Sequence, residues 1–218
     1  MEAGAARSDE RRRERLWWLR LFAVFTSPVS TFAALRDPDK REVDAREEPV
    51  LALILLAGIA QFLATPDVDQ LFNLEHPDAL TIAVVVFLVG SLYGLAAYWI
   101  GGGALRLGIR GAGGAGDYRL ARHILAFALV PLVLSTLIVW PVRLVIYGRS
   151  LFEDGGPDES GAGWWTFETI ELALFLWATV LLVVGVRTVY DWPIFRTLGA
   201  LVLSLLALVA FSLVVSLL

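Results

Sequence analysis

Residues 79–105 form a run of 27 residues that contains no charged side chain. An α-helix rises about 1.5 Å per residue, so roughly 20 residues are enough to cross a bilayer core about 30 Å thick. A longer uncharged run is typical of a transmembrane helix and exceeds what the core of a small soluble protein usually needs. This run alone directs the chain toward a membrane fold.

Four further apolar runs repeat the pattern, at 50–64, 124–147, 166–186 and 194–218. The composition agrees, because 57% of the 218 residues are hydrophobic, only 18% are charged and the mean hydropathy is +0.68. Ordinary globular domains carry about 25% charged residues. We therefore predict an all-α integral membrane bundle of five transmembrane helices with an amphipathic N-terminal segment.

The first of these runs, 50–64, is the shortest. Its fifteen residues cover only about 22 Å as a helix. It can cross the bilayer with the help of flanking residues and local thinning. The alternative is a re-entrant or interfacial segment.

The basic residues predict the orientation of the chain. Sixteen of the eighteen lysines and arginines fall in three segments, 1–49, 106–123 and 187–196, whereas the loops 65–78 and 148–165 are acidic. Basic loops stay in the cytoplasm. The sequence thus predicts a multi-pass protein of the cell membrane with a cytoplasmic N-terminus and an external C-terminus, and an odd number of spans fits this alternation.

The N-terminal segment 1–48 combines aromatic and basic residues ahead of the predicted bundle domain, 49–218. Such a mixture favours helices that lie in the membrane interface and reach anionic head groups. A second short helix is predicted after Ser27 and Pro28, with Val29, Phe32 and Leu35 on one face. These helices either cover the inner rim of the bundle or contact a specific lipid or partner. A cleaved signal peptide is the less favoured reading, because Arg20 interrupts the apolar part.

Together these features resemble the Yip domain family of membrane proteins, named for interacting with Ypt/Rab GTPases, and its prokaryotic-type members in particular. The matching residues are Pro28 and Phe32 before the first span, and Phe127 and Pro131 in the third. The resemblance implies five spans and a non-enzymatic role in membrane organisation or trafficking. The chain departs from the family in two ways: Phe127 replaces the usual tyrosine, and the acidic-Leu-Tyr-Gly-Pro motif of the vesicle-trafficking members is absent.

Three charged residues lie within the third and fourth predicted spans, 124–147 and 166–186. Glu168 and Glu171 follow the interfacial pair Trp164 and Trp165, and Arg143 lies near the end of the preceding span. At 1.5 Å per residue, Glu171 is about 9 Å deep and Arg143 about 6 Å deep. We expect these two residues to pair, directly or through water, because a charge-assisted hydrogen bond offsets part of the cost of desolvation.

Three roles are open to this intramembrane polar cluster of Arg143, Glu168 and Glu171. It can be a structural clasp between two spans, which we favour. The glutamates can instead reach water at the rim without a partner. The cluster can also form a proton or cation pathway, because ionisable residues inside a membrane are often functional.

Small residues and prolines predict how the spans pack. Gly90 and Gly94 form a small-xxx-small pair, which lets helices approach closely inside the bundle or between two copies of the chain. Pro131 and Pro141 remove backbone donors from the third span, so kinks are expected there.

Several functional classes find no support in the sequence. The absence of cysteine excludes disulfides and thiolate sites, and His76 and His123 are predicted on opposite sides of the membrane, so no metal or cofactor is expected. Residues 111–116, GAGGAG, fit a dinucleotide fingerprint formally but follow a membrane span rather than a buried strand. A net charge of −4 argues against nucleic acid, and no catalytic set is recognisable.

We therefore predict a non-catalytic, Yip-like membrane protein that organises the bilayer or recruits a partner. The expected partners are the lipid bilayer and either further copies of the chain or another membrane protein. The alternative function is a small transporter or channel that uses Glu168, Glu171 and Arg143.

Overall fold

The structure, a computed structural model, describes residues 23–36, 47–63, 79–148 and 161–217, and every regular element within them is helical. The N-terminal residues before position 23 and the acidic loops predicted on the external side lie mostly or wholly outside these ranges. The elements are α2 (Pro28–Ala34), α4 (Glu47–Leu63), α6 (Ala79–Gly111), α7 (Tyr118–Ala128), α8 (Val130–Leu134), η1 (Ser135–Val139), α9 (Trp140–Tyr147), α10 (Gly161–Tyr190) and α11 (Ile194–Ser216).

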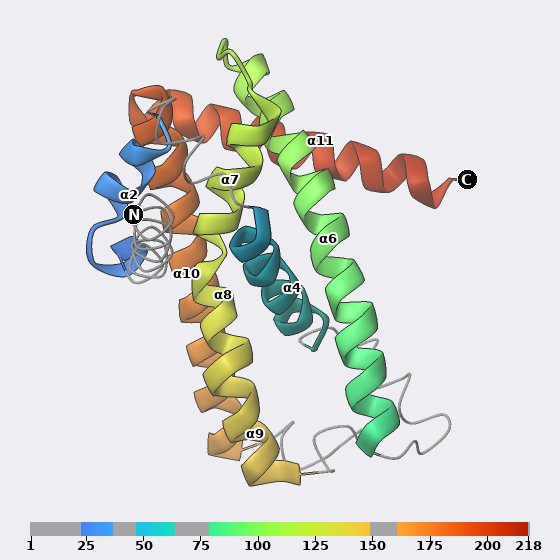
Figure 1. Cartoon of the computed structure of the whole chain (residues 1–218). Coiled ribbons are helices and arrows are strands. Elements are labelled where there is room, and N and C mark those ends of the chain that lie inside the picture. Colours follow the sequence, from blue (N-terminus) through green and yellow to red (C-terminus); the bar gives the residue numbers. More distant parts are fainter. Residues whose placement is uncertain (1–22, 37–46, 64–78, 149–160, 218) are drawn as a thin grey trace, which may run out of the picture.

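Among the described residues, four segments are long and apolar enough to cross a membrane: Leu80–Gly111, Val130–Tyr147, Gly161–Tyr190 and Ile194–Ser216. The apolar stretch Val50–Leu63 of α4 is shorter. The protein is therefore a multi-pass, all-α membrane bundle, as predicted. The apolar segment that matches the first predicted span is shorter than each of the other four. In Figure 1, the axes of α6, α10 and the rod of α8 and α9 are roughly parallel, with α8 and α9 antiparallel to the other two, and α4 lies obliquely between α6 and α8.

The third predicted span is part of a longer rod. The helix begins at Tyr118 rather than at 124, because the carboxylate of Asp117 accepts a hydrogen bond of 3.0 Å from the backbone N–H of Arg119 and caps it. The apolar, membrane-crossing part starts only at Val130. The predicted disturbances occur near the prolines: the helix is interrupted at Leu129, before Pro131, and widens into a π-helical turn at Ser135–Val139, before Pro141.

Gly90 and Gly94 lie at the contact between α6 and α4. A Cβ atom on Gly90 would stand 2.8 Å from the Cα atom of Ile59, and one on Gly94 would collide with the backbone of Ile54 and Gly58. The two helices thus approach with backbone against backbone, which is the small-residue packing that membrane helices use. Gly90 and Gly94 thus form a contact between two helices of the same copy of the chain.

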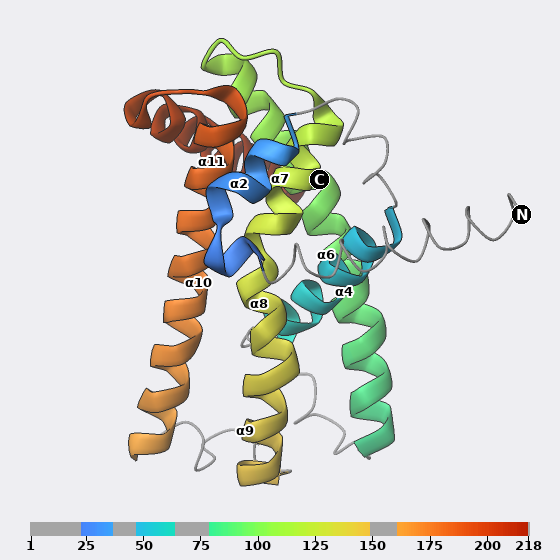
Figure 2. The same ribbon diagram turned by 60° about the vertical axis from the view of Figure 1, so that its left-hand side comes forward.

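Helix α2 packs against the bundle. The side chain of Phe32 is fully buried, and its ring lies at Gly185 of α10, next to Ile124 of α7. Figure 2 shows α2 in front of α10 and α7, along their upper parts. The face predicted from Val29, Phe32 and Leu35 is only partly correct, because Phe32 and Leu35 are buried by protein whereas Val29 is exposed.

Helix α11 lies across the end of the bundle instead of alongside the other spans, as both views show. It crosses α6 where Gly108 meets Ala200 and Ser204, so that a side chain at position 108 would collide with both. Only 11% of its most apolar window is buried within the chain. Whether the C-terminus reaches the external side stays a prediction.

Candidate functional site

The structure brings Arg143 of α9 and Glu171 of α10 together near the end of the bundle where α9 ends and α10 begins. The Nη1 atom of Arg143 donates to the Oε1 atom of Glu171 over 3.3 Å. The side chains are 9% and 17% exposed, respectively. The pairing expected from the two calculated depths is thus the arrangement found. Helices of fixed rise place these residues at the same level, since the chain reverses between them.

Aromatic rings enclose the cation of this pair. The Cζ atom of Arg143 lies 4.9 Å from the ring centroid of Trp140 and 5.6 Å from that of Phe167. Phe167 in turn contacts Tyr147 edge to face, with ring centroids 5.9 Å apart. Ring faces attract a guanidinium ion, so α9 and α10 supply both the counter-charge and the apolar wall.

Two donors of this site remain unused within the described part of the chain. The Nε atom of Arg143 and the Nε1 atom of Trp140 are buried and have no hydrogen-bond partner. Buried donors of this kind are commonly satisfied by internal water. The ion pair is therefore not a fully closed hydrogen-bond network.

Glu168 does not join the pair. Its side chain is exposed, and among the described residues it has no ion-pair or hydrogen-bond partner, unlike Glu171 one helical turn later. The pair therefore has an exposed carboxylate beside it, and the three-residue cluster stays a prediction.

At the opposite end of the bundle, the glycine-rich loop between α6 and α7 is fastened by arginines. Arg106 donates through Nε to the carbonyl of Gly116 over 3.0 Å, and Arg196 donates to the carbonyls of Ala112 and Gly113 over 2.9 and 3.1 Å. A phosphate-binding loop turns backbone N–H groups toward its ligand, whereas this loop uses carbonyl oxygens to bind cations of its own chain. The GAGGAG segment is therefore a structural connection.

Other sequence candidates do not assemble into a site. His123 is buried in α7, and His76 lies outside the described residues. Within the described ranges, no group of three or more histidine, aspartate or glutamate side chains could hold a metal ion. The motif residues Phe32 and Phe127 both belong to the same apolar core cluster, which gives them a packing role.

Sequence reasoning missed one feature, the surroundings of Arg122. Its guanidinium lies on the rings of Tyr98, Trp99 and Tyr118. The available signal was the presence of aromatic residues on both sides of a basic loop, but it required the register between α6 and α7.

A comparison with protein families matches residues 22–216 to the model described as Yip1 domain. The match includes α2 and extends almost to the C-terminus. No curated protein and no solved structure matches the chain.

Proposed function

This chain belongs to the Yip1 domain family, and from that premise we propose that it is a non-catalytic protein of the cell membrane that recruits a partner to the cytoplasmic surface. In this proposal, the bundle, 49–218, is the anchor, and the N-terminal segment, 1–48, is the cytoplasmic region that a partner recognises. The N-terminus is cytoplasmic and the C-terminus external. The arginine-rich ends of α6, α7 and α10 support this orientation.

The docking of α2 is the observation that carries the proposal. Phe32 is fully buried against α10 and α7, so α2 holds the N-terminal segment at one place on the bundle. Its outer face leaves Val29, Ser30 and Ala33 exposed. A short helix fixed on its inner side and open on its outer side is suited to present a chain segment to another protein.

Site-specific crosslinking tests this proposal. A photoreactive residue at Val29 should capture a distinct membrane or cytoplasmic protein in intact cells, whereas one at Leu137, which is equally apolar and exposed on the η1 segment, should capture mainly lipid. Val29→Arg should abolish the cellular function while leaving the protein abundant in the membrane, and in this variant a photoreactive residue at the neighbouring exposed Ala33 should no longer capture the partner. Recruitment through α2 is wrong if Val29→Arg retains full cellular function.

The second candidate function is a small transporter or channel through Arg143, Glu168 and Glu171. It is favoured by the unused donors at Arg143 and Trp140 together with the exposed Glu168, because polar groups of this kind can line a hydrated path. Purified protein in liposomes should then conduct protons or cations, and Glu171→Gln should abolish the flux. Absence of flux from the wild-type protein would leave recruitment as the function.

A further inference from the structure

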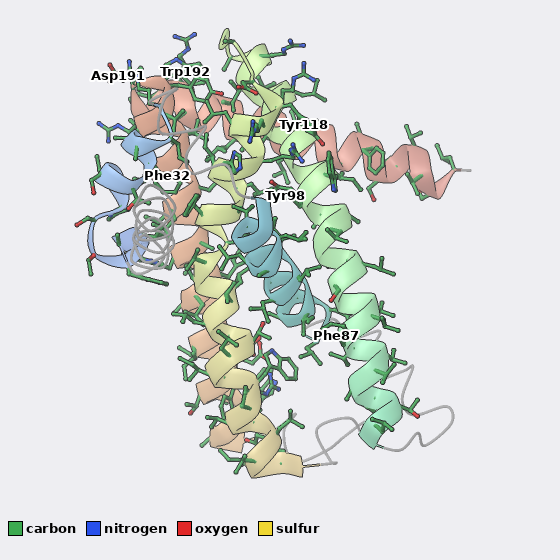
Figure 3. The ribbon with its side chains drawn as sticks, in the orientation of Figure 1. Phe32, Phe87, Tyr98, Tyr118, Asp191 and Trp192 are labelled. Atoms are coloured by element: carbon green, nitrogen blue, oxygen red, sulfur yellow. The ribbon has the colours of Figure 1, made fainter. Side chains whose placement is uncertain are left out.

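Arg122 is held by three aromatic rings at the junction of α6 and α7. Its Cζ atom lies 4.2 Å from the ring centroid of Trp99, 4.8 Å from that of Tyr118 and 5.1 Å from that of Tyr98. The hydroxyl of Tyr118 donates to the backbone carbonyl of Trp99 over 2.9 Å and so ties the start of α7 to α6. Figure 3 shows Tyr98 and Tyr118 in the upper part of the bundle, where α6 and α7 face each other.

The guanidinium of Arg122 has no acceptor within the described residues. It makes no ion pair and donates no hydrogen bond there, and its Nε atom is buried without a partner. Ring faces attract the cation but do not neutralise it, and they leave N–H donors at the edge of the guanidinium plane available. Arg122 thus presents an uncompensated positive charge in a fixed orientation.

A second arginine reinforces this charge. Arg106 lies over the same Tyr118 ring, with 5.9 Å between its Cζ atom and the ring centroid, and it uses Nε for the carbonyl of Gly116. From residue 79 to residue 128, the chain contains four arginines and one acidic residue, Asp117, whose side chain caps α7. The local field is therefore positive and attracts anions.

The cluster lies at the depth of lipid head groups. On α6, nineteen residues separate Leu80 from Trp99, which is about 29 Å and close to the thickness of the hydrocarbon core. On the neighbouring rod, Arg122 precedes the membrane-crossing part at Val130 by eight residues, or about 12 Å. Tryptophan and tyrosine are enriched at this boundary, and anionic lipids make the cytoplasmic leaflet negative.

We propose that Arg122 and Arg106 bind the phosphate of an anionic phospholipid at the cytoplasmic end of α6 and α7. Arg122 supplies the oriented donors and Arg106 the second charge, while Trp99 and Tyr118 fix the geometry. This site does not depend on recruitment through α2, so each can fail without the other.

Thermal unfolding of the purified full-length protein in neutral detergent tests the site. Added phosphatidylglycerol should raise the unfolding temperature more than the same amount of phosphatidylcholine does, and Arg122→Gln should remove at least half of this difference. Arg106→Gln should remove a smaller share. Arg119→Gln is the matched control, because Arg119 is exposed on the same helix and its loss removes the same charge.

Four results would overturn the proposal. The wild-type protein could respond equally to the two lipids, Arg122→Gln could retain the full difference, or Arg119→Gln could lose as much as Arg122→Gln. Inorganic phosphate or glycerol phosphate could also reproduce the whole effect at the same concentration, and the ligand would then be a soluble anion. If Arg122→Gln does not fold, Arg122→Lys should still bind fewer phosphatidylglycerol molecules by native mass spectrometry, because lysine lacks the planar stacked group; unchanged lipid binding would count against the site.

Discussion

Arg143 and Arg122 lie toward opposite ends of the rod formed by α7, α8, η1 and α9, and both lie against aromatic rings, but only Arg143 has a carboxylate partner. Arg143 is buried and is paired with Glu171 over 3.3 Å. Arg122 is half-buried, contacts three rings and has no acceptor in the described part of the chain.

The difference follows from where each arginine lies along the rod. Arg143 is inside the apolar segment Val130–Tyr147, whereas Arg122 precedes it. A charge inside the hydrocarbon core needs a counter-charge from the protein, because the core supplies none. A charge at the head-group layer can use the anionic groups of the lipid itself. Arg143 is thus compensated by a carboxylate of its own chain, whereas the charge of Arg122 is left for a lipid head group to compensate.

The largest effect should come from breaking the internal pair. Replacing Glu171 with Leu leaves Arg143 buried and unpaired, which should cost about 3–5 kcal/mol of stability. The double replacement Arg143→Met with Glu171→Leu removes both charges and should recover most of this loss. Chemical unfolding of the wild-type protein, the two single variants Glu171→Leu and Arg143→Met, and the double variant in the same detergent measures the effect.

This double-mutant cycle separates a structural pair from a functional one. If the double variant is stable and keeps cellular function, the pair is a clasp between α9 and α10. A stable double variant that has lost function would assign the pair to transport or binding instead. An additive cycle, in which each single change costs the same alone and together, would mean that the two charges do not interact.

A smaller loss of stability is expected from removing Arg122. Arg122→Gln removes the cation from its three rings, and cation–π contacts at partly exposed sites contribute about 0.5–1 kcal/mol each, so the loss should be about 1.5–3 kcal/mol in detergent without lipid. Unlike the effect at Arg143, this cost should increase when anionic lipid is present. The contrast between the two arginines would be wrong if Arg122→Gln lowered the free energy of unfolding as much as Glu171→Leu does.

The sequence was sufficient to predict the pair of Arg143 and Glu171 but not the surroundings of Arg122. Counting residues from the ends of two consecutive spans places Arg143 and Glu171 at the same level, because the helical rise is constant and the spans are antiparallel. Arg122 required the register between α6 and α7 across the loop, which no count from span ends provides. Its partners Trp99 and Tyr118 are 19 residues apart, and no motif in the sequence marks them as neighbours.

The position of α11 and the burial of α2 also could not be predicted from the sequence alone. Helix α11 is apolar around most of its circumference, and only the small residues Ala200 and Ser204 mark the face that packs on Gly108 of α6. The sequence of α11 alone does not indicate which helix that face contacts. The spacing in α2 predicted an apolar face, but lipid and protein can both cover such a face. Phe32 is buried because position 185 of α10 is a glycine, and a side chain there would collide with the ring.

The rings around Arg122 allow a finer test of the lipid site. Tyr118→Phe keeps the ring under Arg122 but removes the hydroxyl that donates to the carbonyl of Trp99 over 2.9 Å. A hydrogen bond of this kind contributes about 0.5–1.5 kcal/mol, so stability should fall by about 1 kcal/mol or less. The preference for anionic lipid should weaken but persist, because the charge remains. Complete loss of the preference would mean that the hydroxyl itself contacts the lipid.

The smallest effect is expected at Glu168, the carboxylate beside the internal pair. Glu168→Gln should change stability by less than about 0.5 kcal/mol, because an exposed side chain without a partner contributes little to folding. It serves as the matched control for Glu171, since both glutamates lie on α10, one turn apart. If unfolding measurements instead show a loss similar to that of Glu171→Leu, Arg143 shares its charge between the two carboxylates. The internal site would then be a three-residue cluster, and its contrast with Arg122 would rest on the number of counter-charges as well as on burial.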